Sequence, residues 1–181
     1  NGFYLIKPVN LDPDGTVNWG YTSTAKINEN LWDTEPKYQV GGNEILMNLT
    51  AQSLEDEFLG RVCKTNSKDQ CLLNQRIARI TPVLSFITNE FLHWVLKGKH
   101  FREHVSRVSQ GSKVQHLYNQ DLDEANLCVP SNVQEQREIA SILDSLNAII
   151  RAKCGKLTQI QSLKKSLMQD LLAGRTRVQV N

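Results

Sequence analysis

The sequence predicts an α+β protein in which a mixed α/β domain with short strands is followed by one long C-terminal helix. Segments rich in β-branched and aromatic residues alternate with turn residues up to about Pro130. Two stretches near the end of that region repeat apolar residues at helical spacing. From Ser131 onward apolar residues recur every four and three positions, the pattern of a coiled coil. We therefore expect a domain over residues 1–130, a spacer helix over 131–175 and a tail over 176–181.

The expected strands occupy four segments of the domain. Each combines β-branched or aromatic residues with neighbouring Gly, Pro, Asn or Asp, and the last alternates isoleucines with arginines. The segments are GFYLIKPVNL at 2–11, GGNEILMNLT at 41–50, GRVCKT at 60–65 and RIARITP at 76–82. Such alternation favours a half-buried sheet.

Two short helices are expected within residues 84–108. Phe91, Leu92, Val95 and Leu96 repeat at helical spacing, as do Phe101, Val105 and Val108 further on. Gly98 lies between the two sets and predicts a break. After Gly111 the pattern predicts a loop, a short turn and a strand that ends at Cys128 and Val129.

The long helix is expected to run from Val133 to Ala173, with a capping box formed by Ser131 and Gln134 and a stop at Gly174. At roughly 1.5 Å per residue this helix is longer than the preceding domain is wide, so that domain alone does not bury its apolar seam. A second helix, from another chain or another copy, is therefore expected to pack there, and Gly155 marks a place for a bend. The seam consists of Ile139, Leu143, Leu146, Ile150, Lys153, Leu157, Ile160, Lys164, Leu167 and Leu171.

Charge and composition restrict the function. Residues 1–130 hold 13 Lys and Arg against 15 Asp and Glu, whereas residues 131–181 hold 8 against 4. The domain is thus not basic as a whole, but a local basic segment from His93 to His116 could meet phosphate. The four widely spaced cysteines predict reduced thiols, and the absence of a long apolar run predicts a soluble, cytoplasmic protein without membrane contact.

Two motifs around the long helix resemble those of the specificity subunit of type I restriction–modification enzymes. Its first helix motif, P-x-x-x-E-Q-x-x-I, is similar to Pro130, Glu135, Gln136 and Ile139, with one residue more between Pro and Glu. Its second, L-K-x-x-L-M-Q-x-L-L-x-G-x-x-R-V, is matched by LKKSLMQDLLAGRTRV at 163–178. The resemblance extends over nearly the whole chain and is most specific in the helix.

The resemblance implies a target-recognition domain that reads double-stranded DNA and performs no catalysis, so no cofactor is expected. It implies binding to modification subunits, and through them to the restriction subunit. A complete subunit of this family carries two recognition domains and two long helices, whereas this chain has one of each. We therefore expect a half-subunit that self-associates or pairs with a second half through the seam.

Polar loop residues are the expected DNA contacts, because base edges are read by hydrogen-bonding side chains. Two loops qualify, at 48–60 and at 109–121, and the aromatic residues of NWGYTS are expected at the sugar or groove wall. The predicted contacts are Asn48, Thr50 and Gln52 in the first loop, Gln110, Ser112, Lys113, Gln115, His116 and Asn119 in the second, and Trp19 and Tyr21.

Other functions fit the sequence less well than DNA recognition. HFREH at 100–104 matches the zinc-binding pattern H-x-x-E-H, but its basic flank and the lack of a third ligand disfavour a metal site. The chain contains neither a phosphate loop nor the glycine-rich turn of a methyltransferase, which disfavours ATP or methyl-donor chemistry. The stronger alternative is a non-catalytic adaptor that oligomerises through the long helix.

Overall fold

Strand β1 begins the part of the chain that the computed structural model describes, which covers residues 3–52, 57–83, 85–109 and 115–179. The N-terminal sheet has the strand order β2-β1-β7-β3, in which β1 and β7 are parallel and the other pairs antiparallel. Two short 3-10 helices and helix α1 lie between its strands along the chain. The elements are β1 (Phe3–Leu5), η1 (Pro8–Asn10), β2 (Ala25–Ile27), α1 (Glu29–Thr34), η2 (Pro36–Tyr38), β3 (Gln39–Val40) and β7 (Cys71–Leu72).

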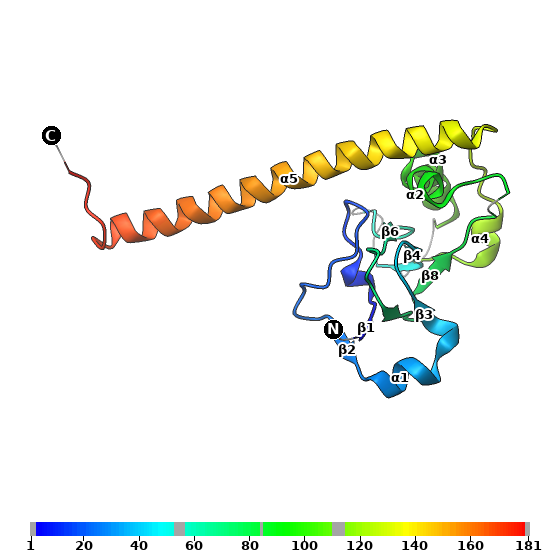
Figure 1. The fold of residues 1–181 in the computed structure, drawn as a ribbon, viewed down its shortest axis with the longest axis horizontal. Helices are drawn as coiled ribbons and strands as arrows, with labels where there is room; N and C mark the ends of the chain where they lie inside the picture. The colour runs from blue at the N-terminus through cyan, green and yellow to red at the C-terminus, as the bar shows by residue number, and fades with distance from the viewer. Residues whose placement is uncertain (1–2, 53–56, 84, 110–114, 180–181) are drawn as a thin grey trace. The chain divides into compact units, whose positions relative to one another are not determined.

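The central sheet has the antiparallel order β6-β4-β8, and helices α2 and α3 lie beside it (Figure 1). All four residues of β4 are buried. Ile45 and Met47 pack with the two helices, whereas Leu46 between them belongs to the cluster around β1 and β7. Strand β4 is therefore covered on both faces. The elements are β4 (Ile45–Asn48), β6 (Val62–Lys64), β8 (Ile77–Ile80), α2 (Asn89–Lys97) and α3 (Lys99–Val108).

The break at Gly98 and the two flanking helices are confirmed, as is the α+β class. The expected strand before Pro130 is wrong, because residues 125–129 form no strand. A two-residue strand, β9 (Gln115–His116), and a short helix, α4 (Asn119–Asp123), precede them instead. Leu127 and Val129 lie on irregular backbone and pack against the core cluster that contains Ile45 and Met47, so burial and not strand pairing explains their apolar character.

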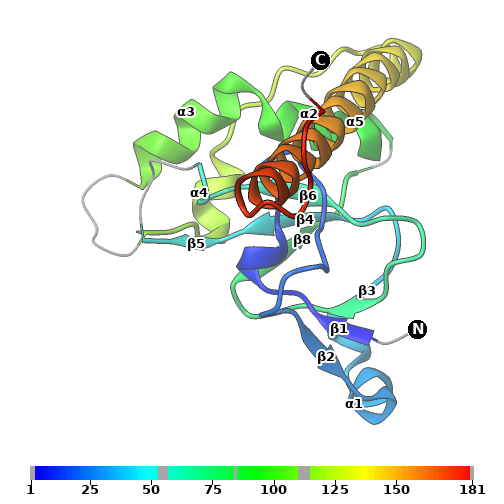
Figure 2. The ribbon, with the colours of Figure 1, turned by 90° about the vertical axis from the view of Figure 1, so that its left-hand side faces the viewer.

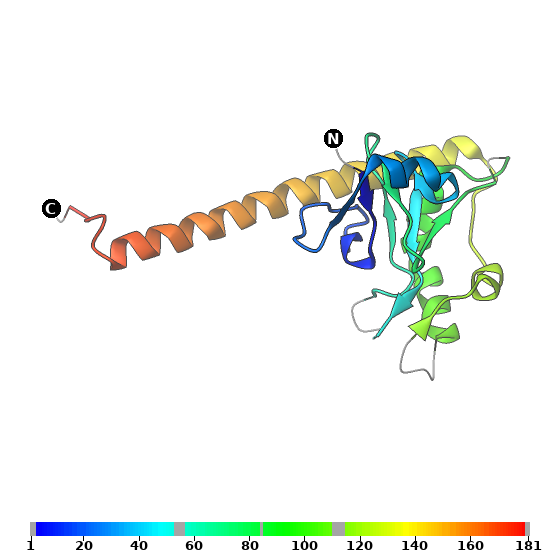
Figure 3. The ribbon, with the colours of Figure 1, turned by 90° about the horizontal axis from the view of Figure 1, so that it is seen from below.

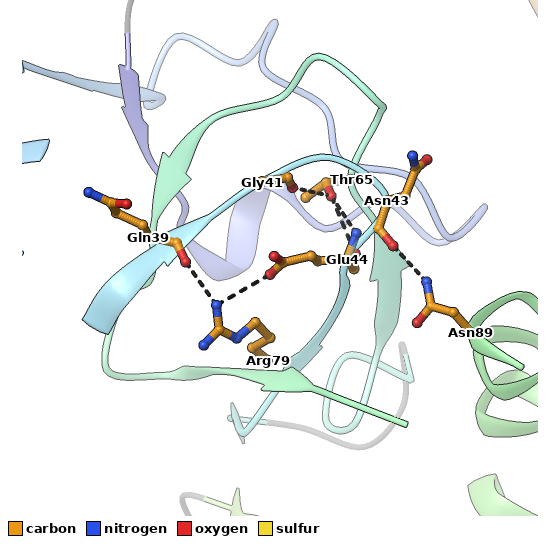
Figure 4. A network of polar contacts seen from close by, with 7 residues as sticks. All are labelled: Gln39, Gly41, Asn43, Glu44, Thr65, Arg79 and Asn89. Carbon is orange, nitrogen blue, oxygen red and sulfur yellow. Dashed lines mark hydrogen bonds and ion pairs between the residues drawn. The ribbon is translucent and has the colours of Figure 1, made fainter. Parts of the chain in front are cut away.

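A polar network fixes the turn between β3 and β4 to its surroundings (Figure 4). The Thr65 hydroxyl donates to the Gly41 carbonyl at 2.7 Å and accepts from the Glu44 amide at 2.9 Å. The Arg79 guanidinium lies 3.5 Å from the Glu44 carboxylate, and the Asn89 side chain donates to a carbonyl of the same turn. Sheet, turn and helix α2 are thereby connected.

The long helix α5 (Val133–Leu172) begins at Val133, as expected, but its cap residue is Asn132 and not Ser131. The Asn132 side chain accepts a hydrogen bond from the Gln134 amide at 2.8 Å, which satisfies one free donor of the first turn. Gln134 itself pairs with Glu138 and not with the cap residue, so the predicted capping box is absent. The cap is therefore the residue that directly precedes Val133.

The chain divides into two units, Asn1–Ser141 and Ile142–Asn181. The first turns of α5 thus belong to the first unit, in which Gln136 and Ala140 are buried and Ile139 packs against the core. In the second unit α5 continues without interruption through Gly155, and its apolar side chains are exposed: Leu157 by 55% and Ile160 by 63%.

Candidate nucleic-acid interface

Strands β5 (Thr50–Ala51) and β9 bring the two predicted DNA-contacting loops together. They pair antiparallel, with Thr50 opposite His116 and Ala51 opposite Gln115. Figures 2 and 3 both show the two strands side by side at one end of the first unit. Residues predicted separately, more than 60 positions apart in the sequence, are therefore direct neighbours.

A cavity of about 390 Å³ opens beside this strand pair. Its polar wall contains three of the predicted residues, Thr50, Gln52 and His116, together with Arg76 from the turn before β8. Pro8, Ala51 and Phe58 supply the apolar wall. Hydrogen-bonding groups around an apolar floor are the general character of a ligand site.

Asn48 shapes this region and does not face a ligand, which corrects its predicted role. Its side chain is fully buried, and the side-chain amide donates to the carbonyls of Thr50 at 2.7 Å and Phe58 at 2.9 Å. These bonds tie both ends of the 48–60 loop to one point. The Gly60 amide also donates to the Asn48 carbonyl, at 2.8 Å.

Arg76 has a fixed backbone and an exposed side chain. Its amide donates to the Asn74 side chain at 3.0 Å, and its carbonyl accepts from the Leu49 amide at 2.8 Å. Leu49 in turn accepts from the Leu117 amide at 2.9 Å, so the turn before β8, β5 and β9 lie in succession. Within the described ranges the Arg76 guanidinium has no hydrogen bond or ion pair.

The other predicted contacts are distributed differently. Gln115 is half-buried and Asn119 is exposed at the start of α4. Trp19 stacks on Tyr4, with ring centroids 4.8 Å apart, and the Tyr21 hydroxyl donates to Asp12 at 2.7 Å. Both aromatic side chains therefore contact residues of the N-terminal segment. Gln110, Ser112 and Lys113 lie outside the described residues.

Two of the four histidines in the basic segment, His93 and His104, are buried. His93 is buried, and desolvation, reinforced by Lys97, lowers its pKa to about 3, so it is neutral. His104 is also buried: its Nδ1 accepts from Arg107 at 3.0 Å, and its Nε2 then donates to the Asp121 carbonyl at 2.6 Å. Both ring nitrogens of this histidine are engaged, which leaves neither to bind zinc.

Sequence reasoning missed Arg76, Phe58 and the role of Gln136. No sequence motif marks Arg76, because its position beside β5 depends on contacts between residues far apart in the sequence. Gln136 belongs to the E-Q-x-x-I motif, and its side chain bonds Thr88, Phe86 and Pro130 within the first unit. The proline and glutamine of that motif therefore connect the helix start to the domain.

The chain thus combines an α+β domain, with a polar strand pair at one end, and a long helix with exposed apolar residues. This is the architecture expected of a DNA specificity subunit. The sequence profile described as type I restriction modification DNA specificity domain matches residues 1–162. The chain belongs to this family, and the resemblance drawn from the helix motifs is confirmed.

Two curated relatives are similar. The type I restriction enzyme MjaVIII specificity subunit of Methanocaldococcus jannaschii is 22% identical over 173 residues, which cover 96% of this chain and 40% of that protein. The type I restriction enzyme EcoDI specificity subunit of Escherichia coli is 32% identical over 98 residues, or 54% of this chain and 21% of that protein. The chain thus spans well under half the length of these relatives.

Solved structures show the same fold. The HsdS subunit from Thermoanaerobacter tengcongensis matches with a TM-score of 0.58 at 14% identity, covering 100% of this chain and 45% of that one. A chain from a structure of type I R-M complex assembly and conformational transition matches with a TM-score of 0.54 at 13% identity, covering 94% and 38%. Within the described part of the chain, no helix is both long and apolar enough to cross a membrane.

Proposed function

We propose that this chain recognises a specific sequence in double-stranded DNA as half of a type I restriction–modification specificity subunit. The observation that carries the proposal is the β5–β9 pair, which joins Thr50, Gln52 and His116 around one cavity in a chain of the DNA specificity family. The relatives' names support the same assignment.

The geometry suits direct reading of a duplex. A two-stranded β-ribbon fits the major groove, which is about 12 Å wide, and side chains at its edge then reach the bases. Thr50 and Gln52 provide both donors and acceptors, and His116 is exposed on the neighbouring strand. Each well-formed bidentate contact discriminates by about 1–3 kcal/mol. Recognition requires no chemistry from this chain, so methylation and cleavage belong to the partner subunits.

The second unit supports pairing through α5. Leu143 is half-buried, and the apolar seam residues beyond it, among them Leu146 and Ile150, are exposed by 37–63% in the single chain. Exposed apolar residues at alternating spacings of four and three are those that a second helix covers. We propose a second copy or a second half-subunit as that partner, with modification subunits bound to the paired helices. Ile139, by contrast, packs against the domain core.

The test is selection of bound duplexes from a random-sequence pool, with the chain alone and with a cognate modification subunit. Enrichment of one short motif, single or repeated as a palindrome at fixed spacing, is the expected result. Binding should weaken steeply with salt, because phosphate contacts release counterions. No enrichment in either condition, with assembly through the helix intact, would favour the adaptor function instead.

A further inference from the structure

The cavity beside β5 is lined by both polar and apolar side chains. Its polar side chains are Thr50, Gln52 and His116, all three predicted to contact DNA, and Arg76, which the sequence did not single out. Arg76 is the only Lys or Arg among the described residues that line this cavity. It comes from a third chain segment, the turn that leads into β8, and its function is not explained by the fold.

The backbone of Arg76 is held by hydrogen bonds on both sides, although its side chain is exposed. Its amide and its carbonyl are both engaged, by Asn74 and Leu49, and Leu49 also pairs with the segment that carries β9. The backbone thus cannot rotate to withdraw the side chain without breaking these bonds. The guanidinium has no internal partner among the described residues, so its five donors remain available to a ligand. A fixed backbone and a guanidinium without an internal partner are the arrangement that recognition requires.

The surroundings favour a base edge over a phosphate as the ligand of Arg76. Phosphate sites gather several cations and backbone amides, whereas this cavity offers one arginine beside Pro8, Ala51 and Phe58. Apolar side chains suit the flat face of a base or the methyl group of thymine. The guanidinium fork matches the two acceptors of guanine, O6 and N7, in the major groove, and no other base presents two acceptors there.

We propose that Arg76 determines specificity by reading a guanine of the target, with Thr50, Gln52 and His116 reading the adjacent base pairs. This inference rests on the proposed function and adds the identity of one recognised base. It requires the planar fork and not merely positive charge, so lysine does not replace arginine.

The experiment is the duplex selection repeated with R76A and R76K, in complex with the cognate modification subunit. K68A is the control, because Lys68 is exposed, carries the same charge and does not line the cavity. For the wild-type chain we expect a motif with an invariant G. In both Arg76 variants the preference for G at that one position should fall by about 5- to 150-fold, while the other positions stay unchanged. K68A should retain the wild-type motif.

Other results separate the possible failures. A uniform loss of affinity for all sequences, with a salt slope reduced by about one, would mean a phosphate contact and overturn the inference. An unchanged motif in R76A, or full retention of the G preference in R76K, would overturn it as well. If the wild-type chain enriches no motif, the proposed function fails and this inference with it. Unchanged thermal midpoints of the variants would confirm that each is folded.

Discussion

The side-chain carbonyl of Gln136, in the first turn of α5, accepts a hydrogen bond of 2.9 Å from the backbone amide of Thr88, the residue that caps α2. Thr88 uses its own hydroxyl to accept from the Phe91 amide at 3.2 Å. The amide nitrogen of Gln136 donates to the carbonyls of Phe86 and Pro130, both at 2.8 Å. One buried side chain therefore connects the starts of α2 and α5.

Replacing Gln136 with Leu should destabilise the first unit by about 3 kcal/mol. Leucine fills a similar volume but leaves one amide and two carbonyls without partners in a partly buried place, and each unpaired group costs about 1–3 kcal/mol. Urea denaturation followed by tryptophan fluorescence measures the change. Gln134→Leu is the control: Gln134 is exposed on the same helix turn, and its replacement should change stability by less than about 0.5 kcal/mol. Equal midpoints for the two variants would contradict the role of Gln136.

The sequence was sufficient to predict those features that depend on local pattern. The helices around Gly98 and the long α5 follow from the spacing of apolar residues, because this pattern repeats within one or two helical turns. Long-range placement was not predictable. Asn48 resembles any polar loop residue in the sequence, yet it is fully buried because Thr50 and Phe58 both turn their carbonyls toward it. Arg76 likewise became a candidate only once β5, β9 and the turn before β8 were adjacent.

His93 should make the fold sensitive to acid. Burial, with the charges of Lys97 and Lys64, lowers its pKa from 6.5 to about 3, against a smaller opposing effect of Asp14. Between these values the unfolded chain binds the proton and the folded chain does not. The stability that the neutral ring contributes is therefore complete above about pH 6.5 and is lost as the pH falls toward 3.

The measurement is the free energy of unfolding of the wild type and of His93→Gln at pH 7 and pH 5. The advantage of the wild type should shrink by about 2 kcal/mol over this interval, because Gln does not titrate. His100→Gln, at an exposed position of α3, is the matched loss of an imidazole. A constant difference between wild type and His93→Gln at the two pH values would show that folding does not lower the pKa of His93.

Gly42 and Gly155 should respond to alanine with opposite signs. A Cβ at Gly42 would overlap the backbone of Ser67, so the turn between β3 and β4 has to move, at a cost of about 1–3 kcal/mol. A Cβ at Gly155 meets no atom within 4 Å, and alanine in a helix interior is favoured by about 1 kcal/mol. Thermal unfolding followed by circular dichroism compares the two variants. A stabilised Gly42→Ala would mean that the turn is not as tightly packed as the structure has it.

The apolar seam of α5 should control the assembly of the chain. Leu146 is 52% exposed in the single chain, and an aspartate in its place would bring an unpaired charge into any helix pair formed there. Leu146→Asp should therefore weaken self-association at least about tenfold, while the first unit keeps its stability. Ala148→Asp adds the same charge two residues away, on the other side of the helix, and should not affect association. Sedimentation velocity over a concentration series measures the mass of each. A wild-type chain of monomeric mass at micromolar concentration would exclude pairing with a second copy, and an unaltered assembly of Leu146→Asp would place the interface elsewhere on α5.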